Sequence, residues 1–155
     1  MLTFGKPYNG SHPSALQVYV NYTPVKVTAG GSQLSTSDMD QGQIYVALTT
    51  GPIQVNTGNK DSNGVQAGTF MDFSDSRILG FGEKTWKDGE RAGDGSSMEK
   101  VTIPIKWREG AKTKKPTHII IVCSASKFGD YFVGGAGSVM YLDDFELIYD
   151  ELTFE

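Results

Sequence analysis

Cysteine and histidine are scarce in this chain, and their scarcity excludes several kinds of site. Cys123 is the only cysteine, so no disulfide can form within the chain. It lies in the apolar stretch IIIVCS, which predicts a buried strand residue and not a nucleophile or a metal ligand. His12 and His118 are the only histidines, and no third partner is recognisable for a zinc site or a serine–histidine relay.

Positive charge and long apolar runs are also lacking. Lys and Arg total 14 against 18 Asp and Glu, which gives a net charge of −4 and a pI near 5.1. Nucleic acid and anionic lipid require a basic face, so neither partner is expected. No apolar run is long enough to cross a bilayer, and we expect no direct membrane insertion.

The length of 155 residues predicts one domain, residues 1–155. Within it, helical periodicity is nearly absent, whereas strand-like alternation is frequent. Pro104 cannot donate to a ladder, so its strand is expected at a sheet edge or a bulge. Long polar segments at residues 29–43, 56–68 and 83–99 separate the strands. Together these features predict an all-β sandwich or barrel. The expected strands lie in residues 16–27, 43–50, 68–73, 77–81, 101–107, 118–124 and 138–149.

The last expected strand contains a carboxylate in an unusual position. Strict alternation places Asp143 on the same side as Phe145 and Leu147. A carboxylate that faces an apolar layer needs hydrogen bonds or a cation, because an unpaired buried charge is costly. We therefore expect Asp143 to point inward and to be held by polar partners.

Several short motifs resemble functional sites but lack their second halves. NKDSNG at residues 59–64 fits the start of a calcium loop, yet its twelfth position is Phe70 where a glutamate is required. An Asn-Gly turn is the better interpretation. SASK at residues 124–127 has no partner motif of a serine acyl enzyme, and GGAGSV at residues 134–139 precedes a strand instead of a helix. Carboxylates are plentiful, but the spacing of a glycosidase pair cannot be read from a β-rich sequence.

Aromatic side chains outside the apolar pattern give a better indication of function. Trp86 lies in GEKTWKDGE, among charges and glycines, where a core tryptophan would be unusual. Sugar rings present apolar faces that stack on aromatic planes, while neighbouring polar groups bond to the hydroxyls. The predicted sugar-contacting residues are Trp86, Tyr19, Tyr45, Tyr131 and Asp130, with Phe132 as a further aromatic candidate.

In order, the segments FGKP, LQVYVNYTP, DQGQIYVAL, VTIPIKW and PTHIIIVCSASKFGDYFVGGAGSVMYLDDFELIYD resemble the putative carbohydrate metabolism domain family of Bacteroides-type bacteria. The resemblance covers almost the whole chain. It implies an antiparallel jelly-roll sandwich similar to galactose-binding domains. It also implies the C-terminal module of a longer exported protein, located in the periplasm or at the cell surface, with its signal and upstream domains outside this sequence. Such jelly rolls often hold a structural calcium near the start of the last strand, and Asp143 matches that region.

These observations leave three functions open. The leading hypothesis is a non-catalytic carbohydrate-binding or accessory module whose partner is a polysaccharide or oligosaccharide. The second is a glycoside hydrolase, or part of one, that uses paired carboxylates. The third is a structural or protein-interaction module. No catalytic residues are assigned, and no cofactor other than a structural calcium is expected.

Overall fold

The computed structural model describes residues 2–55 and 71–154. The calcium-like segment at residues 59–64 lies outside them. None of the helical segments in the described residues could span a bilayer. The described part of the chain contains two short 3₁₀ turns, η1 (Ala111–Thr113) and η2 (Gly129–Tyr131). The strands are β1 (Leu2–Phe4), β2 (Lys6–Pro7), β3 (Ala15–Thr23), β4 (Gly42–Thr49), β5 (Ile53–Val55), β6 (Ile78–Trp86), β7 (Glu99–Pro104), β8 (Lys106–Trp107), β9 (His118–Ser124), β10 (Val139–Ile148) and β11 (Thr153–Phe154).

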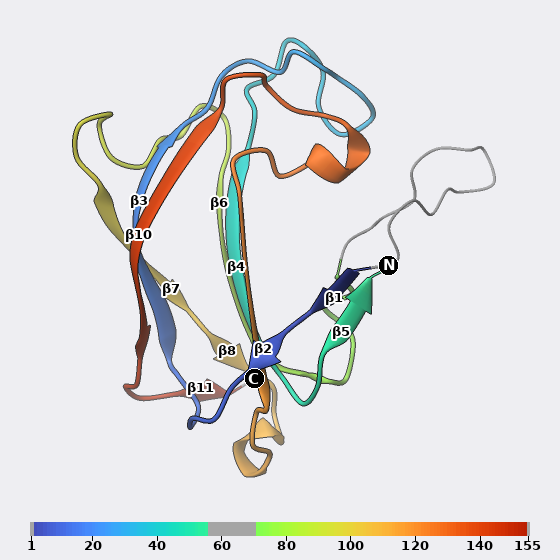
Figure 1. The fold of residues 1–155 in the computed structure, drawn as a ribbon, viewed down its shortest axis with the longest axis vertical. Helices are drawn as coiled ribbons and strands as arrows, with labels where there is room; N and C mark the ends of the chain where they lie inside the picture. The colour runs from blue at the N-terminus through green and yellow to red at the C-terminus, as the bar shows by residue number, and fades with distance from the viewer. Residues whose placement is uncertain (1, 56–70, 155) are drawn as a thin grey trace, which may run out of the picture.

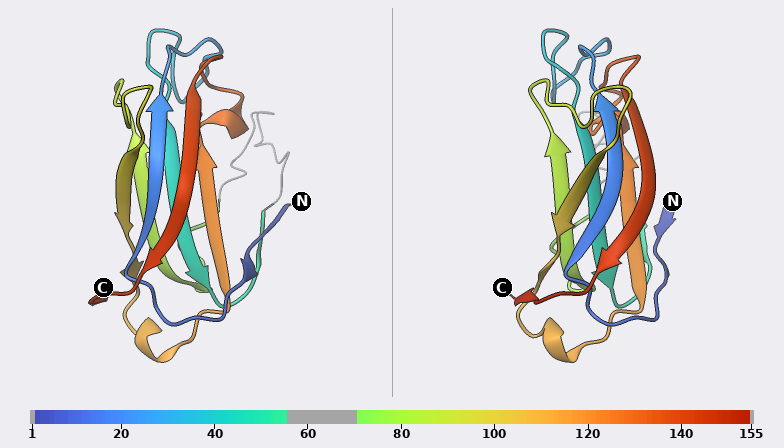
Figure 2. Two further views of the ribbon diagram at one scale, coloured as in Figure 1. Left: turned by 60° about the vertical axis from the view of Figure 1, so that its left-hand side comes forward. Right: turned by 90° about the vertical axis from the view of Figure 1, so that its left-hand side faces the viewer.

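Two sheets face each other and form a sandwich (Figures 1 and 2). The six-stranded sheet has the order β11-β8-β6-β4-β9-β2, and the three-stranded sheet has the order β10-β3-β7. All their neighbouring strands are antiparallel except β11 and β8. The pairs β3–β10 and β4–β9 join early strands to late ones, as in a jelly roll. The predicted antiparallel β-sandwich is confirmed, and Pro104 ends the edge strand β7 as its chemistry requires.

The main core lies between the two sheets because both long early strands alternate apolar and polar residues. Every second residue of β3 and β4 points inward, and the indoles of Trp86 and Trp107 fill the remaining space. Full burial of one such aliphatic or aromatic side chain contributes about 1.5 to 3 kcal/mol. The inward residues of the two strands are Leu16, Val18, Val20, Tyr22, Ile44, Val46 and Leu48.

Strand β6 is longer than the sequence pattern predicts, and it ends at Trp86 instead of Phe81. Gly80 and Gly82 interrupt the apolar alternation of the strand, so the sequence pattern does not show its full length. They are required by packing: a Cβ on Gly80 would lie 2.9 Å from the Trp107 ring, and one on Gly82 would lie 2.3 Å from the carbonyl oxygen of Pro104. Of the strand expected at residues 68–73, residues 71–73 are not extended in a sheet, and the rest lies outside the described residues.

A second, smaller core covers the outer face of the six-stranded sheet. The two-stranded ribbon of β1 and β5 lies over this face, to the right of the sheet in Figure 1. The buried residues of this core are Ala47, Ile53, Val55, Met71, Ile78 and Ile120, with Phe4, Tyr45, Phe73, Phe81 and Val122 packed around them. This layer forms one side of the candidate site below.

Asp143 does not point inward, and the prediction that it does is wrong. Met140 and Leu142 pack on the core. Asp143, the next residue after Leu142, therefore points to the opposite face of the strand and is exposed. Pairing with β3 then slips between Asp143 and Glu146, which returns Leu147 to the core opposite Leu16. Such a bulge breaks the two-residue alternation on which the prediction depended.

Asp40, and not Asp143, is the buried carboxylate held by polar partners, and it ties the glycine-rich turn at residues 134–137 to the sheet. Its side chain is fully buried, and its Oδ2 accepts hydrogen bonds from Ser126 Oγ at 2.6 Å, Ser138 Oγ at 2.8 Å and the Gly135 amide at 2.9 Å. Oδ1 accepts from the Gln41 amide at 2.9 Å. Donors on every side make this buried carboxylate tolerable and fix the β9–β10 loop.

Candidate functional site

A cleft of about 270 Å³ lies on the outer face of the six-stranded sheet. Strands β4 and β9 form its floor with Gln43, Tyr45, Val122 and Ser124, since Gln43 pairs with Ser124 and Tyr45 with Val122. The small outer core forms one wall, and the β9–β10 loop forms the other. The remaining lining residues are Leu2, Phe4, Met71, Cys123, Ser126, Lys127, Gly129 and Asp130.

Tyr45 lies on the floor of the cleft, and two phenylalanine rings pack against one side of its ring. The ring packs edge-on against Phe73 at 5.3 Å between centroids and lies 6.2 Å from Phe81. Burial, together with the negative charge of Asp130, raises the pKa of Tyr45 to about 12. The phenol is therefore a neutral donor at physiological pH, and among the described residues its hydroxyl has no hydrogen-bond partner.

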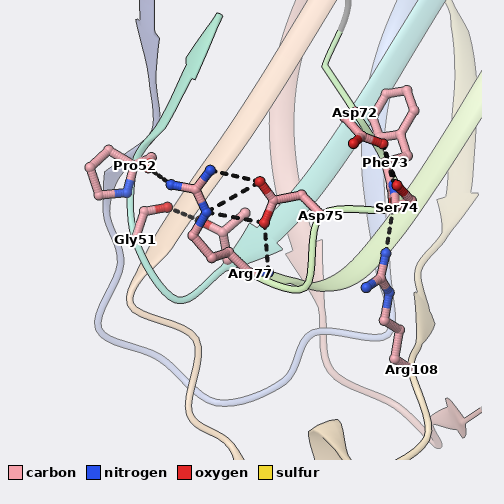
Figure 3. A network of polar contacts seen from close by, with 9 residues as sticks. Gly51, Pro52, Asp72, Phe73, Ser74, Asp75, Arg77 and Arg108 are labelled. Atoms are coloured by element: carbon pink, nitrogen blue, oxygen red, sulfur yellow. Dashed lines mark hydrogen bonds and ion pairs between the residues drawn. The ribbon is translucent and has the colours of Figure 1, made fainter.

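A polar network fixes the segment that carries Phe73 (Figure 3). Arg77 pairs with Asp75 at 2.6 Å and also donates to the carbonyl of Pro52 at 3.1 Å, beside β5. The guanidinium bonds lower the pKa of Asp75 to about 2. Arg108 donates to the carbonyl of Phe73. Arg108 holds the backbone of Phe73 itself, and Arg77 ties nearby Asp75 to Pro52. Together these charge-assisted bonds fix Phe73 beside Tyr45.

The opposite wall carries one cation and one anion. Lys127 follows β9, and its amide donates to the carbonyl of Gln41 at 2.7 Å, while its ammonium lies 5.3 Å from the centre of the Phe128 ring. Asp130 lies in η2, and its carboxylate has no hydrogen-bond partner within residues 2–55 and 71–154. Charged groups of both signs that still have bonding capacity can accept from and donate to the hydroxyls of a neutral ligand.

The thiol of Cys123 borders this cleft but is not activated. Burial raises its pKa to about 11, so the thiol stays protonated at neutral pH. Cys123 is half-buried and packs against the main core, in agreement with the predicted strand position.

Trp86 does not belong to a loop, and the expectation that it stands outside the core is wrong. Its indole is 3% exposed and packs on Tyr22, with 5.8 Å between ring centroids. The charged and glycine-rich neighbours that pointed to a loop belong to the end of β6 and the turn after it. A buried ring offers no face to a sugar, so Trp86 is removed from the candidate site.

The other predicted residues separate into two places. Tyr45 and Asp130 meet in the cleft, whereas Tyr19 lies on the outer face of the three-stranded sheet, between the inward residues Val18 and Val20. Tyr131 lies in η2 next to Asp130 but does not line the cleft. Phe132 follows with 79% of its side chain exposed.

Among the described residues, Asp143 does not belong to a cluster of metal-ligating side chains. Its Oδ1 accepts a hydrogen bond from the Asp144 amide at 2.9 Å. In the part of the chain that the structure describes, no group of three or more histidine, cysteine, aspartate or glutamate side chains is arranged to hold a metal ion. The calcium hypothesis therefore gains no support here and stays a prediction.

Sequence reasoning did not assign Gln43, Ser124, Ser126 and Lys127 to a site. Alternation along β4 gives a usable signal, because Gln43 and Tyr45 both oppose the inward Ile44 and Val46. The pairing of β4 with β9 is a tertiary fact, and so is the return of the β9–β10 loop over that face.

Comparisons with known proteins agree with this architecture. A family model described as "Putative carbohydrate metabolism domain" matches residues 1–148. A solved "putative glycoside hydrolase" from Bacteroides thetaiotaomicron VPI-5482 has 20% sequence identity and a TM-score of 0.64. A second, from Bacteroides vulgatus ATCC 8482, has 19% identity and a TM-score of 0.60. Comparison with curated protein sequences gives no match.

Coverage is unequal between this chain and the solved ones. The first comparison covers 97% of this chain but 41% of the solved chain, and the second covers 94% and 55%. This chain thus spans about half the length of the proteins that share its fold, and at such identities the likeness shows the fold alone. Because the family model matches nearly the whole sequence, the chain belongs to the Putative carbohydrate metabolism domain family.

Proposed function

We propose that this chain is a non-catalytic carbohydrate-binding module and that the cleft on the six-stranded sheet receives a short oligosaccharide or a chain end. One observation carries the proposal. The Tyr45 hydroxyl and the Asp130 carboxylate line the same cavity of about 270 Å³, and neither has a hydrogen-bond partner among the described residues. The volume is near the lower limit of small-molecule sites, which span about 300 to 1,000 Å³.

The chemistry of the lining suits a neutral sugar. Met71, Val122 and the Tyr45 ring give apolar contacts for C–H groups. Asp130 accepts from hydroxyls, Lys127 donates to them, and Tyr45 does either. The net charge of the Lys127 and Asp130 side chains cancels, so the cleft does not select for a charged ligand.

Binding is favoured over hydrolysis by the number of carboxylates. Glycoside hydrolysis generally uses two, about 5 to 10 Å apart across the scissile bond. Asp130 is the one carboxylate among the described residues that line the cleft. A single acceptor holds hydroxyls without supplying both an acid and a base or nucleophile.

The test is a glycan array of short neutral and acidic oligosaccharides, followed by calorimetry on the tightest binder. Asp130→Asn is expected to weaken binding about 10- to 100-fold, because it removes a charged acceptor worth about 1.5 to 3 kcal/mol. Tyr45→Phe keeps the ring and is expected to cost up to about tenfold. Binding should not change between pH 7 and 9, because the Tyr45 phenol titrates near 12.

Asp150→Asn is the matched control, since Asp150 is exposed and lies outside the cleft. Its affinity should equal that of the unmodified protein. No binding to any oligosaccharide, or equal effects of Asp130→Asn and Asp150→Asn, would contradict the proposal.

We further propose that the module acts beside other domains of an exported protein, in the periplasm or at the cell surface. The solved chains with this fold are longer than this chain, which supports the proposal that the module acts beside other domains. Cell fractionation followed with an antibody against this chain tests the location, and a purely cytoplasmic signal would contradict it.

A further inference from the structure

Exposed aromatic side chains concentrate on the outer face of the three-stranded sheet. Tyr141 is 65% exposed and Phe145 is 46% exposed, and both lie on β10. Tyr19 of β3 lies on the same face, directly opposite Asp143 of β10 and Lys100 of β7. Several large rings exposed to water on one sheet face are unusual in a fold that has cores to bury them. They therefore indicate a contact surface.

The β10 bulge brings polar groups between these rings. Asp144 adopts a left-handed conformation with φ of 51°, and its amide donates to Asp143 Oδ1. Pairing resumes with Glu146 opposite Gln17, so Glu146 also faces outward beside Phe145. A non-glycine residue in this region of φ is uncommon, and bulges often aim side chains at binding sites.

Two open hollows follow each other along this face. The first, of about 420 Å³, is lined by Asn21, Gly95, Met98, Tyr141, Leu142 and Asp143. The second, of about 350 Å³, is lined by Gln17, Tyr19, Asp144, Phe145 and Glu146. Aromatic rings therefore alternate with carboxylate and amide groups along this face. The segment from residue 141 to residue 146 is about 15 Å long.

The charge of the face restricts its ligand. Asp143, Asp144 and Glu146 line the hollows, while Lys100 is the cation directly opposite Tyr19. This excess of negative charge repels uronic-acid and sulfated polymers. Hydroxyl donors of a neutral polymer can bond to the same carboxylates, and its ring faces can stack on Tyr141, Tyr19 and Phe145.

We propose that this outer face binds the interior of a neutral polysaccharide chain, laid along β10 from Tyr141 to Glu146. The inference deepens the proposed function and rests on it: the cleft takes a chain end or a short oligosaccharide, and the sheet face takes an extended segment. The two sites lie on different sheets, so either one can fail without the other.

Affinity gel electrophoresis with galactomannan, arabinoxylan or dextran in the gel tests this surface, with polygalacturonate as the anionic probe. We expect retardation by at least one neutral polymer and none by polygalacturonate. The double variant Tyr141→Ser with Phe145→Ser should weaken binding to the retarding polymer at least about tenfold, while Tyr141→Phe, which keeps the ring, should retain it.

Phe132→Ser is the matched control, because Phe132 is 79% exposed but lies on the β9–β10 loop, away from this face. It should bind the retarding polymer like the unmodified protein. Circular dichroism and thermal unfolding establish that each variant is folded. Absence of retardation by all three neutral polymers, equal losses with Phe132→Ser, or retardation that the double variant retains would overturn the proposal; the last result would still leave the cleft as a sugar site.

Discussion

Two aspartates show how burial decides the role of a residue. Asp40 was not distinguished by the sequence, yet it is fully buried and accepts hydrogen bonds from Ser126, Ser138 and Gly135 through one oxygen. Asp143 has a conspicuous sequence position but lies exposed. The first aspartate maintains the architecture of the β9–β10 loop, which carries Lys127 and Asp130 into the cleft.

Asp40→Ala is expected to lower the free energy of unfolding by about 2 to 4 kcal/mol, because hydroxyl and amide donors lose their acceptor inside the protein. Urea denaturation followed by circular dichroism measures the change. Asp150→Ala, at an exposed position, should change stability by less than about 0.5 kcal/mol. Equal stability of the two variants would mean that the Asp40 network does not hold the loop.

At the scale of elements, β10 is the strand whose irregularity has the largest consequences. Its register shift between Asp143 and Glu146 sends Leu147 to the core and leaves Phe145 outside. The same shift builds the second hollow of the outer face. A regular strand at this place would satisfy the ladder but would not present these side chains together.

Asp144→Gly is expected to stabilise the protein by up to about 1 kcal/mol, because glycine adopts the left-handed φ of 51° without steric cost. Glu146→Gly, in the regular part of the same strand, should destabilise by about 0.5 to 1 kcal/mol. Guanidinium denaturation of both variants gives the comparison. Destabilisation by both substitutions would show that the bulge does not require a left-handed residue.

For the whole molecule, both tryptophans belong to the core between the sheets. Trp107 is 0% exposed and Trp86 is 3% exposed. Trp107 donates from Nε1 to the carbonyl of Pro13 at 2.8 Å, so its polar group is satisfied internally. Neither indole reaches the cleft or the outer face of the three-stranded sheet.

Tryptophan fluorescence is therefore expected to report folding and not sugar binding. The emission maximum should lie at short wavelength in the native protein, move to longer wavelength on unfolding, and stay unchanged when a bound oligosaccharide saturates the cleft. Iodide should quench the native protein far less than the urea-unfolded chain. A wavelength shift on ligand binding, with no change in circular dichroism, would place an indole in a binding site.

Strand alternation, the scarcity of helical periodicity and the family signature predicted the sandwich correctly, because these are local patterns that survive into the fold. Pro104 predicted either a sheet edge or a bulge for its strand, and β7 is an edge strand. Tyr45 and Asp130 belong to the set of predicted sugar-contacting residues and line the same cleft, although nothing in their spacing showed that they meet. The length of β6 was underestimated because Gly80 and Gly82 serve close packing that the sequence does not display.

The sequence by itself thus determined an antiparallel β protein with a net charge of −4 and its membership of a carbohydrate-related family. Only the tertiary structure decided which aromatics are available: Trp86 is enclosed by the second sheet, whereas Tyr45, Tyr141 and Phe145 remain accessible on outer faces. The physical reason is that exposure depends on strand pairing and on bulges between residues far apart in the chain. A single register shift in β10 exchanged the inward and outward positions that alternation alone had assigned.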